Sequence, residues 1–300
     1  MRTAFIEELA AQARLRPEIF LVVGDLGYSV VETFAEEFPE RFLNAGVAEQ
    51  NMTGVAAGLA SEGWHVFTYS IANFPTLRCL EQIRNDICYH DLPVTVVAVG
   101  GGLAYGNLGY SHHAVQDLAV MRSLPGITVL APADPGETRE CMQWLVTHPG
   151  PSYLRLGKAG EPGLHEVRGI EEGPLLVRKG EGHFAIVATG AILKVALAAA
   201  DELGKAGRQV AVYSQPWLKP VTNEFFWALA KYQRVLALEE HVGSGGLADL
   251  LRENLPGVRV DSLAVPEGTH HDVGSQAYLR ERAGLSVTQI EIVEGFGVRD

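Results

Sequence analysis

Short apolar runs that end in glycine or a polar residue alternate along this chain with helical stretches, and this alternation limits the fold more than any other feature. The runs "IFLVVGDLG", "HVFTYSI", "PVTVVAVGGG", "ITVLAPAD" and "PSYLRLG" are typical of strands buried on both faces. Stretches with a helical pattern, such as residues 46–61 and 76–90, lie between them. Strands that alternate with helices predict an α/β domain with a mainly parallel sheet.

The alternation stops once and then resumes. The segment that begins at Lys158, "KAGEPGLHEVRGIEEGPLLVRKGEG", is rich in Gly, Pro and charge, which predicts a linker. After it, "HFAIVATG", "QVAVYSQ", "RVLALEEH" and "VRVDSLAV" repeat the strand pattern. We therefore predict an α/β domain over residues 1–160, a linker over 161–181 and a smaller α/β domain over 182–300. A chain of 300 residues is long enough for both domains.

Charge and cysteine content narrow the class of protein. The formal net charge of −12 argues against a broad nucleic-acid surface, although a local basic site can still bind a small anion. Cys79, Cys88 and Cys141 are widely spaced and form no CxxC pair, which is typical of reduced thiols in a cytosolic protein. The first residues, "MRTAFIEELAAQARLRP", do not resemble a signal peptide, and no apolar run is long enough to cross a bilayer. We expect a cytoplasmic protein without membrane contact.

One carboxylate stands out in a segment of small residues. Glu49 lies in "LNAGVAEQNMTGVAAGLA", and the next charged residue after it is Glu62. We expect a helix over 46–61 with Asn44 near its start as a cap. Glu49 then has two interpretations: a first-turn carboxylate that complements the helix dipole, or an acid that works in an apolar site. The local sequence does not decide between them.

A second polar cluster, "SHHAVQD" at residues 111–117, follows a glycine-rich loop. Its paired histidines, His112 and His113, point apart and have no obvious third ligand, so we expect no metal site in this chain. A neutral histidine at the rim of a pocket fits better, and a surface pair is the alternative. The chain has no GxxxxGK[ST] loop and no GxSxG elbow, so neither a P-loop nucleotide site nor a serine hydrolase is indicated.

Taken in order, six blocks resemble a known family. They are "GDLGYS", "RFLNAGVAEQNMTGVAAGLA", "TYSIANFPTLRCLEQIRND", "GYSHHAVQDLAVMRSLPGITVLAPAD", "PSYLRLGK" and "VLALEEHVGSGGL". Together they are similar to the C-terminal two-thirds of transketolases and to the matching part of 1-deoxyxylulose-5-phosphate synthases. The resemblance covers nearly the whole chain. It implies a pyrimidine-binding domain followed by a transketolase C-terminal domain, with thiamine diphosphate as the cofactor.

The resemblance also implies a set of cofactor contacts. Glu49 matches the family glutamate that hydrogen-bonds ring nitrogen N1′ of the aminopyrimidine and so activates the cofactor. Gln50 follows it in the same motif. Leu26 falls in the turn that faces the cofactor, and Phe74 falls where an aromatic ring packs on the pyrimidine.

Substrate contacts are implied by the same matches. His112 matches the family histidine that contacts substrate oxygens. Arg2 and Ser29 match positions that help to bind the sugar phosphate in some transketolases. Lys158 matches a basic phosphate contact that is usually Arg.

Three departures from the family pattern put the acceptor sugar in doubt. Ala72 and Pro75 stand where two pyrimidine-packing aromatic residues are usual, which leaves Phe74 to supply the ring. Gly100 replaces a phosphate-binding histidine, and Leu108 replaces an aspartate near the substrate hydroxyls. We therefore do not assume the usual sugar phosphate.

The chain also lacks the GDG motif with a downstream Asn that binds the diphosphate through Mg²⁺. The resemblance then implies an N-terminal partner subunit that carries that domain and the metal, in an α₂β₂ assembly that self-associates through the pyrimidine domain. The reaction expected is transfer of a two-carbon ketol unit from a ketose phosphate to an aldose phosphate. The β subunit of a 2-oxoacid dehydrogenase and a non-catalytic regulatory homologue are the alternatives.

Overall fold

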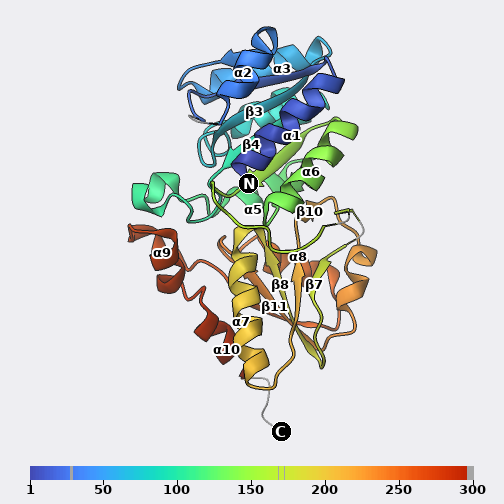
Figure 1. The fold of residues 1–300 in the computed structure, drawn as a ribbon, viewed down its shortest axis with the longest axis vertical. Coiled ribbons are helices and arrows are strands. Elements are labelled where there is room, and N and C mark those ends of the chain that lie inside the picture. Colours follow the sequence, from blue (N-terminus) through green and yellow to red (C-terminus); the bar gives the residue numbers. More distant parts are fainter. Residues whose placement is uncertain (28–29, 168, 172, 296–300) are drawn as a thin grey trace.

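The computed structural model describes residues 1–27, 30–167, 169–171 and 173–295, and it forms two stacked α/β units (Figure 1). In the first unit the helices are α1 (Arg2–Leu15), α2 (Glu32–Glu37), α3 (Glu49–Ser61), α4 (Leu80–Gln82), α5 (Asp117–Ser123) and α6 (Pro135–Thr147). Its strands are β1 (Ile19–Val23), β2 (Phe42–Asn44), β3 (His65–Ile71), β4 (Val94–Val99), β5 (Thr128–Leu130) and β6 (Ser152–Leu156). A π-helical segment, Ile83–Cys88, continues α4.

The first sheet has the strand order β10-β5-β6-β4-β3-β1-β2, and β1 to β6 pair in parallel. Every residue of β1, β4 and β6 is buried, as expected for strands covered by helices on both faces. In Figure 1, α1 and α6 lie side by side on one face of this sheet. All six parallel strands end at the same edge, which is where ligand-binding loops gather in such sheets.

The second unit contains the remaining elements. Its helices are α7 (Leu193–Lys205), α8 (Leu247–Asn254), α9 (Gln276–Arg282) and α10 (Val287–Gly295). The strands in this part of the sequence are β7 (Leu175–Arg178), β8 (Phe184–Thr189), β9 (Ala211–Ser214), β10 (Trp217–Lys219), β11 (Arg234–Glu239) and β12 (Arg259–Leu263). The second sheet has the order β12-β11-β8-β9-β7, in which the edge strand β7 pairs antiparallel and the other pairs are parallel. The predicted fold class, two α/β units with mainly parallel sheets, is confirmed.

Two short strands depart from the predicted organisation. β7 lies inside the segment predicted as a linker, because Leu175 and Leu176 pair with Ser214 and Tyr213 of β9. β10 leaves the second half of the sequence and adds to the edge of the first sheet, where it pairs antiparallel with β5. The exact domain boundaries stay a prediction.

Helix α3 begins at Glu49, three residues later than expected. Asn44 does not cap it, because the Asn44 side chain accepts hydrogen bonds from the Asp25 and Gly46 amides and donates one to the Asp25 carboxylate. The helix buries one face and exposes the other. Its buried apolar residues are Met52, Ala56, Ala57 and Ala60. Its exposed residues include Gln50, Asn51, Gly54 and Gly58.

A buried ion pair lies where the two units meet. Arg155 of β6 binds Asp117 of α5 at 2.8 Å, and it also donates to the carbonyls of Ala114 and Glu240, at 2.7 and 3.0 Å. The Glu240 side chain, in turn, accepts from Arg280 at 2.5 Å. Burial raises the pKa of Glu240, but Arg280 outweighs it and holds that pKa below its usual value. The network ties the end of the first sheet to the second unit.

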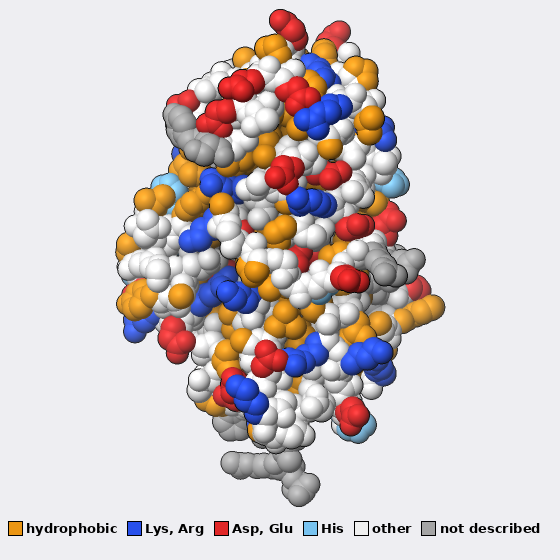
Figure 2. Space-filling model, viewed as in Figure 1, with side chains coloured by type: hydrophobic (Ala, Val, Ile, Leu, Met, Phe, Trp, Pro, Cys, Tyr) orange, Lys and Arg blue, Asp and Glu red, His pale blue; other side chains and the backbone are white. Residues whose placement is uncertain are grey.

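The surface carries no dominant basic area on the face seen in Figure 2, where Lys and Arg side chains are interspersed with Asp and Glu. Within the described ranges, no helix is both long and apolar enough to cross a membrane. All three cysteines are free and buried.

Candidate active site

Glu49 is the best-buried carboxylate among the predicted site residues. It is the first residue of α3, and its side chain is 1% exposed. One carboxylate oxygen lies 3.4 Å from the Ser70 hydroxyl at the end of β3, and the other accepts a 2.6 Å hydrogen bond from Arg78. A buried carboxylate with two side-chain partners keeps hydrogen-bonding capacity for a ligand.

Gly24, at the end of β1, leaves the room that this carboxylate needs. A Cβ at Gly24 would lie 3.3 Å from the Ser70 hydroxyl and 3.5 Å from Glu49 Cγ. The next residue, Asp25, has a left-handed backbone with φ of 56°, and Asn44 holds its carboxylate. The sequence "VVGDLG" therefore builds a tight turn against Glu49 rather than a phosphate loop.

Phe74 joins Glu49 to the histidine loop. The Arg78 guanidinium lies over the Phe74 ring, 4.6 Å from its centroid, and the Phe74 ring also contacts His112, at 5.2 Å with the rings 70° apart. Asn73 holds the loop in place, because its amide donates to the carbonyls of Ser111 and His113 at 3.2 and 2.8 Å. Glu49, Phe74 and His112 thus lie in one continuous cluster.

The His112 ring is suited to neutral hydrogen bonding. Its Nδ1 lies 3.0 Å from the Ser111 hydroxyl. Partial burial, with a smaller contribution from His113, lowers the pKa of His112. An imidazole that stays neutral near pH 7 can accept a proton at one nitrogen and donate one at the other.

A small cavity adjoins this cluster through Ser70. Its volume is about 170 Å³. It is lined by Arg2, Leu26, Gly27, Tyr69, Ser70, Ile71, Val99 and Tyr105. Arg2 Nε is buried and makes no hydrogen bond to any residue that the structure describes. A guanidinium beside a polar cavity favours a ligand with an anionic or hydroxyl-bearing group.

The other predicted contacts are more scattered. Lys158 is exposed, with Nζ 3.4 Å from the Ala104 carbonyl, so it lies beside the loop that carries Tyr105. Gln50 is exposed on the outer face of α3, away from the buried side. Ser29 lies outside the described residues.

The three family departures have visible local consequences. Gly100 has φ of 84°, and a Cβ there would lie 2.2 Å from the Tyr105 ring, so Tyr105 fills the space beside Gly100. Leu108 is 50% exposed. Ala72 is fully buried, which leaves Phe74 as the aromatic residue of this turn that faces His112.

Sequence reasoning missed Arg78, Asn73 and Tyr105. The helix predicted over 76–90 includes Arg78, but the helical part begins only at Leu80, and Arg78 lies in the preceding turns. A signal for Arg78 exists: it is the only cation between Phe74 and Glu81 in a motif otherwise matched to a cofactor site. Neither Asn73 nor Tyr105 carries a comparable signal.

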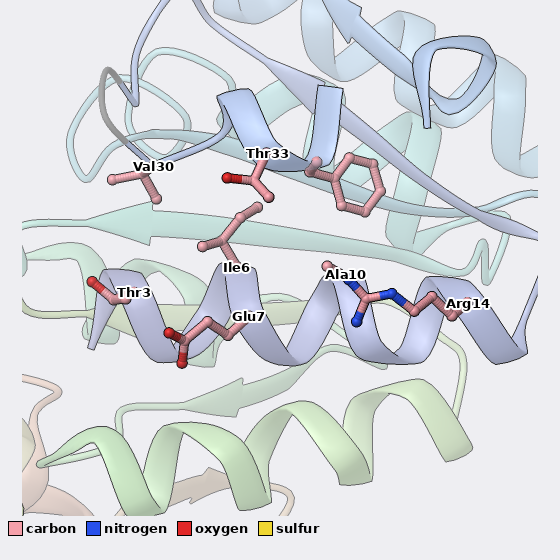
Figure 3. Close-up of a pocket in the computed structure, with 8 residues that line it drawn as sticks. Thr3, Ile6, Glu7, Ala10, Arg14, Val30 and Thr33 are labelled. Atoms are coloured by element: carbon pink, nitrogen blue, oxygen red, sulfur yellow. The ribbon is translucent and has the colours of Figure 1, made fainter. Parts of the chain in front are cut away.

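A larger cavity of about 310 Å³ lies elsewhere, between α1 and α2 (Figure 3). Ile6, Ala10 and Phe34 form its apolar side, while Glu7 and Arg14 project from α1. None of the predicted site residues lines it. Across the described ranges, no group of three or more His, Cys, Asp or Glu side chains is placed to hold a metal ion.

Comparisons with known proteins agree with this fold and site. A family model described as the transketolase pyrimidine-binding domain matches residues 1–160, and one for the transketolase C-terminal domain matches 173–290. The two units are thus the pyrimidine-binding and C-terminal parts of an enzyme that depends on thiamine diphosphate. The chain belongs to the transketolase family.

Individual relatives cover the chain almost completely. It is 33% identical over 304 residues to a subunit of the apulose-4-phosphate transketolase of Phocaeicola vulgatus, covering 98% of this chain and 97% of that protein. It is also 33% identical to 1-deoxy-D-xylulose-5-phosphate synthase 1 of Geobacter sulfurreducens, covering 95% of this chain but 46% of that protein. A solved split-gene transketolase, described as an inactive beta4 tetramer, superposes with a TM-score of 0.84 at 35% identity, covering 96% and 94% of the two chains. The resemblance stated from the sequence is confirmed.

Proposed function

We propose that this chain is the C-terminal subunit of a two-component transketolase that moves a two-carbon ketol unit from a ketose to an aldose. The observation that carries the proposal is the Glu49 carboxylate, 1% exposed and facing the Arg78–Phe74–His112 cluster. Full-length similarity to a protein named as one subunit of a transketolase supports the two-component form.

The residues present fit the aminopyrimidine end of thiamine diphosphate. A buried carboxyl matches a ring nitrogen, and the face of Phe74 matches a flat aromatic ring. Leu26 and Ser70 line the adjoining cavity. When bound, the cofactor supplies the reactive thiazolium carbon that carries the two-carbon unit.

Each residue of this chain has a proposed task. Glu49 holds a proton at N1′ of the pyrimidine ring, and Ser70 orients its carboxyl. Neutral His112 exchanges a hydrogen bond or a proton with a substrate oxygen, in a position set by Asn73. Arg2 and Lys158 supply positive charge at the cavity, which supports an anionic sugar such as a sugar phosphate.

The diphosphate and Mg²⁺ are assigned to a partner subunit. Two features support this assignment: the described part of this chain places no cluster of His, Cys, Asp or Glu side chains to hold a metal ion, and its sequence has no GDG…N motif. We place self-association on the pyrimidine domain, where Gly54 and Gly58 leave the outer face of α3 open to close packing. Three free, buried cysteines support a cytoplasmic location.

The test is reconstitution with the partner subunit, followed by ketol-transfer assays on Glu49→Gln. We expect a loss of at least about 100-fold in turnover with the complex intact, because the amide cannot hold the proton that the carboxyl holds. Glu62→Gln, which changes an exposed carboxylate just after the same helix, is the matched control and should leave turnover unchanged. Full activity of Glu49→Gln would remove the basis of the proposal.

A further inference from the structure

Arg78 covers the Glu49 carboxylate at the centre of the site. Its side chain is 45% exposed, whereas the Glu49 side chain beneath it is 1% exposed. The guanidinium makes two contacts at once: a 2.6 Å hydrogen bond to Glu49 Oε2 and a face contact with the Phe74 ring at 4.6 Å. Arg78 therefore stands between Glu49 and solvent.

Access to Glu49 from the other directions is closed. A Cβ at Gly24 would already lie 3.5 Å from Glu49 Cγ and 3.6 Å from the Met52 sulfur, so the interior side has no room for a ring. Ser70 occupies the side of the second carboxylate oxygen. A planar ligand that reaches the Glu49 carboxylate must therefore approach from the side where Arg78 lies.

A guanidinium group resembles an aminopyrimidine in the properties that matter here. Both are planar and delocalised, both present N–H donors at the edge, and both stack on an aromatic face. The two partners of Arg78, a carboxylate and an aromatic ring, are the two partners that the ring of the cofactor requires under the proposed function.

We propose that, in the unloaded chain, Arg78 occupies the position of the aminopyrimidine ring, and that the cofactor binds by displacing it. The proposal rests on the proposed function. Until the cofactor arrives, Arg78 compensates the buried Glu49 charge, which is costly to leave alone. Part of the binding free energy of the cofactor is then used to break the Arg78 contacts, so Arg78 sets the affinity.

The first experiment measures thiamine diphosphate binding by calorimetry, with Mg²⁺, on the complex with the partner subunit. Arg78→Met keeps the length and apolar stem but removes the guanidinium. We expect the dissociation constant to fall by about tenfold, the combined effect of a half-exposed ion pair and a cation–π contact. Arg84→Met is the matched control from the same segment, because Arg84 is exposed and hydrogen-bonds its neighbour Asn85; its dissociation constant should not change.

The second experiment uses the wild-type complex and does not depend on how the variant folds. Phenylglyoxal labels accessible arginines, and mass spectrometry of the peptide that contains Arg78 reports its reactivity with and without cofactor. Displacement predicts that loading increases the labelling of Arg78. Protection on loading, or weaker cofactor binding by Arg78→Met, would show that Arg78 is a permanent support of Glu49 and would overturn the displacement proposal while leaving the function standing. No cofactor binding by the wild-type complex would overturn the proposed function itself.

Discussion

Replacing Asp117 by Asn tests whether the buried ion pair with Arg155 holds the first unit together. The side chains of Asp117 and Arg155 are 0% and 5% exposed, and their closest N–O distance is 2.8 Å. Asp117→Asn leaves the Arg155 charge buried without its counter-charge and weakens the hydrogen bond from Tyr153, which is 2.6 Å long. Breaking a buried pair in this way costs about 3–5 kcal/mol. We expect a loss of unfolding free energy of this size.

The matched control is Glu37→Gln, which breaks the exposed Arg14–Glu37 pair. That pair is shorter, at 2.6 Å, but its side chains are 54% and 33% exposed. Exposed pairs contribute little, because water and salt screen them. Urea unfolding followed by tryptophan fluorescence measures both variants, and the slope with urea should stay constant. If Asp117→Asn shifts the free energy of unfolding no more than Glu37→Gln does, the argument that burial decides the contribution is refuted.

Three further predictions concern single residues. Gly100→Ala should lower the free energy of unfolding by about 2–4 kcal/mol, because its φ is 84° and its Cβ would overlap the Tyr105 ring; adding Tyr105→Ala should recover part of the loss in urea unfolding, and no recovery would contradict the overlap. Burial lowers the pKa of His65 to about 4, so the unfolded chain binds more protons between pH 4 and 6.5 and stability falls as the pH falls through that window. His65→Phe should therefore be less sensitive to pH there by up to about 3 kcal/mol in unfolding free energy, and identical pH profiles would count against it. Asn73→Ala frees the loop that carries His112 and should lower turnover by about 10- to 100-fold in steady-state assays of the complex, while normal turnover would mean that the loop holds itself.

The strand framework could be read from the sequence because its signal is local. β1, β4 and β6 are continuous apolar runs that end in turn residues, and every residue in them is buried. Such runs depend little on what packs against them. The partner strand of a three-residue segment is different, because it is set by tertiary contacts alone. β10 gives no local sign that it joins the first sheet.

The helix predicted over 76–90 shows where periodicity fails. Ile83 and Ile87 are both fully buried, four residues apart, and the structure is helical or π-helical from Leu80 to Cys88. The first turn is lost because the Thr76 hydroxyl donates to the Ala72 carbonyl at 2.6 Å, which favours a turn over a helix start. This local hydrogen bond, which no spacing rule contains, is what places Arg78 over Phe74.

The candidate site was partly predictable for a similar reason. Glu49 stands out because a lone charge among small residues is visible in the sequence. Its contact with Arg78, 29 positions later, depends on how β3 and the following turn place that side chain. The cluster of Glu49, Phe74 and His112 is therefore a product of the fold, even though each member lies in a recognisable motif.

The second unit takes part in this geometry although the residues at the centre belong to the first. Gly102 pairs with Ala114 at the base of the loop that carries His112, and a Cβ at Gly102 would lie 2.6 Å from Glu240 Cβ. The loop is fixed again where the Gly274 amide donates to the Gly106 carbonyl at 3.2 Å, and Figure 1 shows this segment beside α9. The His112 loop is thus held by Asn73 on one side and by the second unit on the other. A change at Gly102 should alter turnover without touching the cofactor contacts, because it acts through the position of His112.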